Sequence, residues 1–104
     1  MMLVLAGACQ SSDVSRALGA RCATDSDCDE KCLEPSADWP GGFCTLICDT
    51  DDDCPGGSRC TTEDDGVCEI SCGSDADCAY LGAYTCVAYD SKGGGTKVMV
   101  CRGD

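Results

Sequence analysis

The chain has 104 residues, of which thirteen are cysteine and none is histidine, and nineteen acidic against seven basic side chains give a formal net charge of −12. This charge argues against binding to nucleic acid and against adsorption to anionic lipid headgroups, because both depend on clusters of lysine and arginine. Without histidine a catalytic serine or cysteine lacks its usual partner, and so short a chain offers no deep cleft around paired acids. We therefore expect no enzymatic activity.

The chain begins with an apolar, uncharged segment, residues 1–8, that is directly followed by Cys9. The segment is too short to span a membrane, which takes about 20 residues. It resembles the end of a bacterial lipoprotein signal peptide, although Ala6 stands where leucine is usual and no basic residues precede the apolar run. In that family the cysteine thiol is diacylglycerylated and the chain is cleaved before it. The resemblance implies a signal-peptide remnant at residues 1–8 and lipidation of Cys9; the alternative is a buried apolar strand with a stray thiol.

Residues 9–21 are mostly small and polar, and we interpret them as a lipid-anchored tether with an r.m.s. span of about 20 Å. Gln10 follows the cysteine directly. In the lipoproteins of Gram-negative bacteria that this segment resembles, an Asp at that place retains the protein on the inner membrane. The resemblance therefore implies sorting to the outer membrane.

The pattern Cys-x-[Ser/Thr]-Asp-x-Asp-Cys then occurs three times, at residues 22–28, 48–54 and 72–78. Each occurrence opens a unit of four cysteines, and the units cover residues 22–47, 48–71 and 72–104. A unit of about 25 residues cannot bury enough apolar surface to fold without cross-links. We expect six disulfides, no cofactor and no structural metal, because the Cys-x-x-Cys pairs typical of zinc and iron–sulfur sites are absent from the sequence. Metal thiolates are the alternative.

Each unit is predicted to consist of a short helical turn and a β-hairpin, which makes the fold a small disulfide-rich protein with little regular secondary structure. Residues 24–27, 50–53 and 74–77 match the capping-box pattern, with Asp in place of the preferred Glu. In unit three, residues 87–89 and 97–100 flank a glycine-rich turn, and in unit two Asp65-Gly66 is a turn signal. In unit one the corresponding segment is expected to be a longer, irregular loop around Trp39.

Two further motifs have a functional interpretation and a simpler one. The Asp-x-Asp pairs supply the oxygen ligands that Ca²⁺ takes, and the densest group, Asp49, Asp51 and Asp53, is the candidate for a weak calcium site. Capping of the turns accounts for the same residues, and we favour it. The chain also ends in Arg102-Gly103-Asp104, which resembles the integrin-recognition tripeptide of disintegrins, but a free terminus just past a cysteine favours a chance match.

Residues 51–60, Asp-Asp-Asp-Cys-Pro-Gly-Gly-Ser-Arg-Cys, resemble the central part of whey-acidic-protein (four-disulfide-core) domains, without their Cys-Cys doublet and eight-cysteine layout. The resemblance implies that Cys48 pairs with Cys60 and that Cys54 pairs further downstream. It also suggests an alternative function, a small proteinase inhibitor that uses residues 34–43 or 55–59 as its rigid loop.

Four cysteines allow three connectivities in each unit. We predict first-to-third and second-to-fourth pairing throughout, because a capped turn points its two cysteines to different sides, where each can reach a different strand of the hairpin. The predicted disulfides are Cys22–Cys32, Cys28–Cys44, Cys48–Cys60, Cys54–Cys68, Cys72–Cys86 and Cys78–Cys101.

As a whole, the chain resembles bacterial secreted or surface lipoproteins that are built from tandem cysteine-rich repeats. The resemblance implies a non-enzymatic, extracytoplasmic module that binds a partner or has a structural role at the cell surface. It would be attached to the outer membrane through the lipid on Cys9, or secreted. A protein or glycan ligand is expected, without further identification from the sequence.

Overall fold

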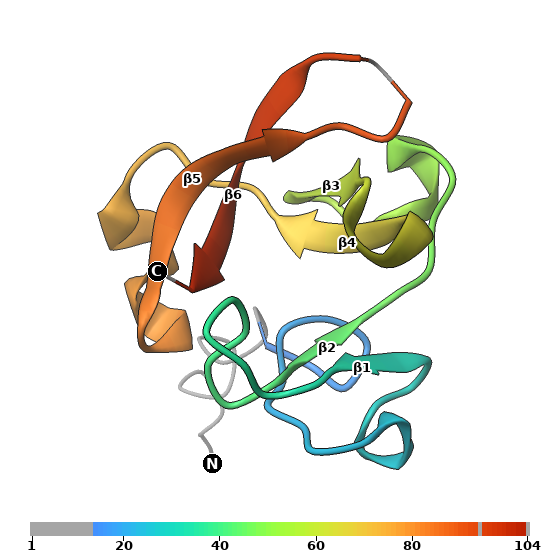
Figure 1. The fold of residues 1–104 in the computed structure, drawn as a ribbon, viewed down its shortest axis with the longest axis vertical. Coiled ribbons are helices and arrows are strands. Elements are labelled where there is room, and N and C mark those ends of the chain that lie inside the picture. The colour runs from blue at the N-terminus through green and yellow to red at the C-terminus, as the bar shows by residue number, and fades with distance from the viewer. Residues whose placement is uncertain (1–13, 94, 104) are drawn as a thin grey trace, which may run out of the picture.

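The computed structural model describes residues 14–93 and 95–103. The expected signal-peptide remnant, Cys9 with its predicted lipidation and the terminal Asp104 lie outside these described residues. Within them, short strands and 3₁₀ helices alternate along the chain, as Figure 1 shows. None of the described helices combines the length and the apolar character that crossing a bilayer requires.

Each four-cysteine unit contains a 3₁₀ turn followed by an antiparallel hairpin, which confirms the predicted fold class. The elements are η3 (Asp25–Asp27), β1 (Lys31–Leu33) and β2 (Phe43–Thr45) in unit one; η4 (Asp51–Asp53), β3 (Ser58–Thr61), η5 (Glu63–Asp65) and β4 (Val67–Ile70) in unit two; and η6 (Asp75–Leu81), β5 (Tyr84–Asp90) and β6 (Lys97–Gly103) in unit three. The longer loop that was expected around Trp39 is therefore the connection of the hairpin predicted for unit one.

The disulfides fasten each turn to the face of its own hairpin. In all three hairpins the third and fourth cysteines lie directly opposite each other, as Cys60 and Cys68 do between β3 and β4. These opposite cysteines do not bond to each other. Instead, each forms a disulfide with one cysteine of the preceding turn segment, and the six pairs agree with the predicted connectivity (Cys22–Cys32, Cys28–Cys44, Cys48–Cys60, Cys54–Cys68, Cys72–Cys86 and Cys78–Cys101).

The segments that join the units begin within strands, because Thr45 is the last residue of β2 and Glu69 belongs to β4, and both side chains are fully buried. The hydroxyl of Thr45 donates to the carbonyl of Cys68 at 2.6 Å, and the amide of Cys68 donates to the carbonyl of Leu46. Units one and two are thus hydrogen-bonded to each other through their joining segment.

Unit three is bound to both other units. Bridges link Thr61 to Ser91 and Ser71 to Val100, and the amide of Gly103 donates to the carbonyl of Asp38 in unit one at 2.7 Å. In Figure 1 the β5–β6 hairpin arches across the upper left of the molecule, beside β3–β4, while β1–β2 lies below. The three units therefore form one body in the described part of the chain.

The second half of the expected tether is part of this body. Gly19 donates its amide to the carbonyl of Cys44, and Cys44 donates back to Ala20, so these residues extend the pairing of β2. Leu18 is buried and belongs to the same apolar cluster as residues of all three units. Interpreting residues 9–21 as a free tether is therefore wrong from about Ser15 onward, because Leu18 supplies apolar surface that the small core needs.

The core consists mainly of cystines and a cluster of three aromatic rings. Trp39 and Phe43 of unit one lie 5.2 Å apart between ring centroids, and Tyr84 of unit three lies within 6.5 Å of both. The hydroxyl of Tyr84 donates to the carbonyl of Pro40 at 3.2 Å. Aromatic pairs contribute about 0.5–1.5 kcal/mol beyond the area they bury, so this cluster holds units one and three together.

Reduction of the disulfides under otherwise native conditions should unfold the chain, because removing even one native disulfide from a small domain typically costs about 2–5 kcal/mol. The near-ultraviolet circular dichroism of the Trp39 cluster measures the loss of tertiary structure. The intact mass measures the reduction itself and should rise by two hydrogens for each of the six bonds. Treatment with an alkylating agent but no reductant is the control and should leave these twelve sulfurs unmodified. A persistent near-ultraviolet signal after complete reduction would contradict the dependence of the fold on its cystines.

Candidate functional site

The two acids of each repeat have separate structural roles. The second acid completes the predicted capping box, since the carboxylate of Asp53 accepts hydrogen bonds from the amides of Asp49 and Thr50 at 2.9 and 3.3 Å. The same box forms in units one and three, where the carboxylates of Asp27 and Asp77 accept from the amides of the residues three and four positions earlier. The predicted capping is confirmed in all three units.

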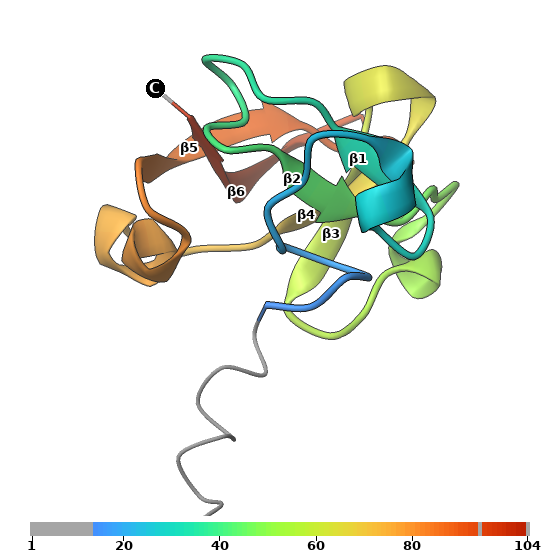
Figure 2. The ribbon, with the colours of Figure 1, turned by 90° about the horizontal axis from the view of Figure 1, so that it is seen from below.

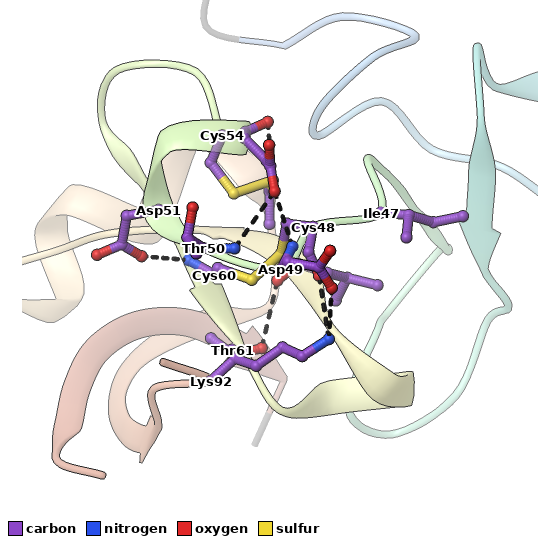
Figure 3. The surroundings of a disulfide bond; sticks show 12 residues. Ile47, Cys48, Asp49, Thr50, Asp51, Cys54, Cys60, Thr61 and Lys92 are labelled. Carbon is purple, nitrogen blue, oxygen red and sulfur yellow. Dashed lines mark hydrogen bonds and ion pairs between the residues drawn. A yellow bond between two sulfur atoms is a disulfide. The ribbon is translucent and has the colours of Figure 1, made fainter. Parts of the chain in front are cut away.

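The first acid binds the hairpin, a role that the sequence analysis did not identify. The carboxylate of Asp51 accepts the amide hydrogen of Cys60 at 2.8 Å, on the side of β3 that faces away from β4 (Figure 3). Asp25 and Asp75 accept the amide hydrogens of Cys32 and Cys86 in the same way, both at 2.9 Å. An unpaired amide at a strand edge needs a partner, and these carboxylates supply it. The signal was in the sequence, because this Asp occupies the same place in every repeat.

These hydrogen bonds stabilise the ionised carboxylates. The amides of Ala23 and Thr24 hold the pKa of Asp27 below its usual value, and the amides of Asp49 and Thr50 do the same for Asp53. The pKa of Asp51 is lowered by the amide of Cys60 and by the Arg59 guanidinium. A carboxylate whose folded-state pKa is lowered stabilises the fold fully only above its unfolded-state pKa. Acid should therefore weaken these turns as the pH falls below about 4.

The calcium candidates Asp49, Asp51 and Asp53 all use their carboxylates within the protein. Asp49 binds the ammonium group of Lys92 at 3.1 Å (Figure 3). Asp51 and Asp53 hold the amides described above. No three carboxylates among the described residues bring their oxygens within 4.8 Å of one another. Sulfur atoms do cluster that closely in each unit, but they are bound in disulfides and cannot act as thiolate ligands.

Replacing Asp51 with alanine should lower the free energy of unfolding by about 1–2 kcal/mol, because the amide of Cys60 then loses its charged acceptor. Asp52 is the matched control, since it lies in the same turn and its carboxylate has no hydrogen bond or ion pair in the described structure. Asp52→Ala should change stability by less than about 0.5 kcal/mol. Urea unfolding of both variants makes the comparison, and equal losses would contradict the role assigned to Asp51.

The charged cluster around Arg102 is the second feature that sequence analysis did not find. Arg102 lies on β6, is only 6% exposed, and stacks between the rings of Trp39 and Tyr89, with centroid distances of 4.7 and 3.9 Å. Its guanidinium contacts Glu69 at 3.2 Å and Glu63 at 3.1 Å, both in unit two. Arg102 therefore joins the aromatic cluster of unit one, the acids of unit two and the strand of unit three.

The carboxylate of Glu69 is the fully buried member of this cluster. It accepts hydrogen bonds from the hydroxyl of Thr61 and from Arg102, and Glu63 shares the same guanidinium. Burial raises the pKa of Glu69 to about 7, although the bonds from Thr61 and Arg102 act in the opposite direction. The two carboxylates raise the pKa of Arg102 against the effect of its burial.

This arrangement also bears on the terminal Arg-Gly-Asp sequence. Integrin-type recognition requires an exposed arginine, whereas the guanidinium of Arg102 is enclosed by two rings and bound to two carboxylates. Gly103 lies in β6 and is hydrogen-bonded to Asp38, and Asp104 lies outside the described residues. The arginine has a structural role in this fold.

The two loops considered for proteinase inhibition are folded onto the body. In residues 34–43, Trp39 and Phe43 point into the core, and the carbonyls of Asp38 and Pro40 accept hydrogen bonds from unit three. Residues 55–58 form a tight turn, in which the amide of Ser58 donates to the carbonyl of Pro55. Arg59, the basic residue of the second loop, lies in β3 and is ion-paired with Asp51 at 2.9 Å.

Searches against protein families, curated proteins and solved structures found no match for this chain.

The stability of the protein should decrease as the pH rises from about 5.5 to about 8. Glu69 has a usual pKa of 4.5 and a folded-state pKa of about 7, so the folded state binds more protons than the unfolded state between these values. We expect a loss of roughly 1–3 kcal/mol, measured by urea unfolding at the two pH values. Glu69→Gln keeps an acceptor for Thr61 and Arg102 and should remove most of this dependence. A Glu69→Gln variant with an unchanged pH profile would contradict this assignment.

Proposed function

We propose that the chain is a non-enzymatic module that is held at the outer membrane or cell surface through a lipid on Cys9. There it binds a protein or glycan, or has a structural role. Secretion without an anchor is the related alternative. One observation carries the proposal: each of the twelve repeat cysteines has a disulfide partner, so Cys9 is the thirteenth cysteine and is not needed by the framework.

The disulfides themselves indicate an oxidising compartment, because glutathione and thioredoxin keep cytosolic thiols reduced. This environment is compatible with export across a bacterial inner membrane. The apolar residues 1–8 before Cys9 support such a route, and small residues precede the cysteine as they do in lipoprotein signals.

A binding or structural role fits the way the polar side chains are used. The carboxylates of Asp25, Asp51 and Asp75 hold strand amides, and the buried acid Glu69 is paired with Arg102. These groups maintain a rigid body. The rigidity favours recognition, because a preordered surface loses little conformational entropy on binding.

The proteinase-inhibitor alternative has no comparable observation in its favour. The turn at residues 55–58 and the loop at residues 34–43 both use backbone groups to hold the body together. Titration against serine proteinases would detect inhibition directly, and tight binding there would replace the present proposal.

Incorporation of radiolabelled fatty acid tests the lipid anchor, with the chain expressed behind an intact bacterial lipoprotein signal peptide. The wild-type chain should be labelled, and Cys9→Ala should not be, because the thioether needs the thiol of that residue. Ser11→Ala is a matched control near the same site and should be labelled normally. Equal labelling of Cys9→Ala and wild type would show that the lipid is attached elsewhere or not through this signal.

A further inference from the structure

A hollow of about 210 Å³ lies on the surface where the described chain begins. Its lining includes Ala17 and Leu18, the turn at residues 55–57, Ile70 and Tyr80, so it combines the start of the chain with units two and three. None of the residues that line it carries a charge. The chain has nineteen acidic side chains, but none of them lines this hollow, in contrast to the acidic turns described above.

The same surface exposes apolar groups. Tyr80 is 47% exposed, and Val14, which directly precedes the lining residue Ser15, is 36% exposed. Gly56 adds no side chain, and the space beyond its backbone is open. We call this surface the entry face and define it by Val14, Ala17, residues 55–57 and Tyr80; Leu18 and Ile70 also line the hollow but are buried.

The entry face lies close to the residue at which the lipid is proposed. Val14 follows Cys9 by five residues, and a chain of that length spans at most about 18 Å even when fully extended. Figure 2 shows the first described residues and the segment between η4 and β3 on the lower side of the molecule, with the end of β6 on the upper side. An anchor at Cys9 therefore brings the lower side nearest to the lipid.

We infer that the entry face rests against the headgroup layer of the membrane when the chain is anchored through Cys9. This inference rests on the proposed lipid anchor and adds the orientation of the module. Tyrosine is enriched at membrane–water interfaces, where its ring is partly buried and its hydroxyl stays hydrated. The uncharged lining of the hollow avoids the repulsion that anionic headgroups would exert on the acidic turns, and the one charged residue of the same segment, Arg16, is a cation.

This orientation determines which surface remains available to a partner. The end of β6 and the loop at residues 34–42, which lie on the upper side in Figure 2, face away from the membrane. The exposed residues of that loop, including Glu34 and Asp38, are thus presented to the surroundings of the cell. In this orientation the headgroup layer covers the exposed apolar side chains of the entry face, Val14 and Tyr80.

Fluorescence quenching on vesicles tests the orientation. The full chain is coupled through the Cys9 thiol to maleimide-bearing phosphatidylethanolamine in vesicles of brominated phosphatidylcholine, so that the result does not depend on lipidation in cells. Tyr80→Trp places a fluorophore on the entry face, and Ala37→Trp places one on the exposed loop of the upper side; the buried Trp39 is common to both. We expect quenching of the Tyr80→Trp variant to be at least about twofold stronger, because bromine on an acyl chain quenches only a fluorophore that comes close to it, and aromatic side chains settle at the boundary between headgroups and acyl chains. Equal quenching, or stronger quenching of Ala37→Trp, would overturn the inference.

Placing a negative charge at one of two exposed glycines tests whether the entry face itself contacts the membrane. Gly56 and Gly93 both have open space beyond their backbones, and Gly93 lies in the β5–β6 connection rather than on the entry face. In vesicles that also contain phosphatidylglycerol, Gly56→Glu should weaken the quenching of Tyr80→Trp, whereas Gly93→Glu should not. Equal effects of the two substitutions would contradict a specific face. If the uncoupled chain forms dimers and Gly56→Glu dissociates them, the entry face binds a second copy of the chain. That result would also overturn the inference.

The two proposals fail in different ways. If Cys9→Ala is labelled as well as wild type but the vesicle experiment shows preferential quenching, the lipid anchor is wrong and the apolar entry face remains. If only wild type is labelled but quenching is equal at both positions, the anchor stands and the orientation is wrong.

Discussion

The pair of disulfides that ties each acidic turn to its hairpin is the constraint on which the other features depend. Strands of three to seven residues are too short to be stable as isolated hairpins in water. The third and fourth cysteines stand opposite each other on one face of each hairpin, so both disulfides reach the same turn. That geometry brings the first acid of the repeat within reach of a strand amide. The carboxylate then satisfies an edge that would otherwise be open to pairing with another chain.

The second level of organisation joins the units, and among the described residues the buried Arg102 contacts all of them. Arg102 is the point at which the aromatic cluster of unit one meets Glu63 and Glu69 of unit two. Burying a charge without a partner is costly, and removing one partner of a buried pair is strongly destabilising. The contact between units is therefore specific, because only this packing gives Arg102, Glu69 and Glu63 their hydrogen bonds. Outward-facing acids account for most of the remaining charge and keep a small body with little core soluble.

Local features could be predicted from the sequence because each one depends on neighbouring residues. The constant gap of five residues between the first two cysteines marked the turns, and the hydroxyl and acid of the capping box identified their ends. The disulfide pairing followed from the same geometry. Asp65-Gly66 was a correct turn signal, although the turn also places Asp64 in a left-handed conformation within η5.

The arrangement of the units could not be predicted, because it depends on contacts between residues that are distant in the sequence. Nothing local distinguishes Glu69 from the many exposed acids, yet it is fully buried beside Arg102, thirty-three positions later. Leu18 looked like part of a polar tether, and its burial follows only from the space that the other units leave. The entry face has the same origin, since residues 55–57 and Tyr80 become neighbours only after units two and three have packed.

Non-reducing peptide mapping of the disulfides tests the central claim most directly, because every other contact described here assumes that the turns are fastened to their hairpins in one way. The account predicts that each unit yields first-to-third and second-to-fourth linkages, such as Cys48–Cys60 and Cys54–Cys68 in unit two. Linkage of opposite cysteines within a hairpin, such as Cys60 to Cys68, would contradict it. So would linkage between units, such as Cys44 to Cys48, since the turns would then not be fastened to their own hairpins.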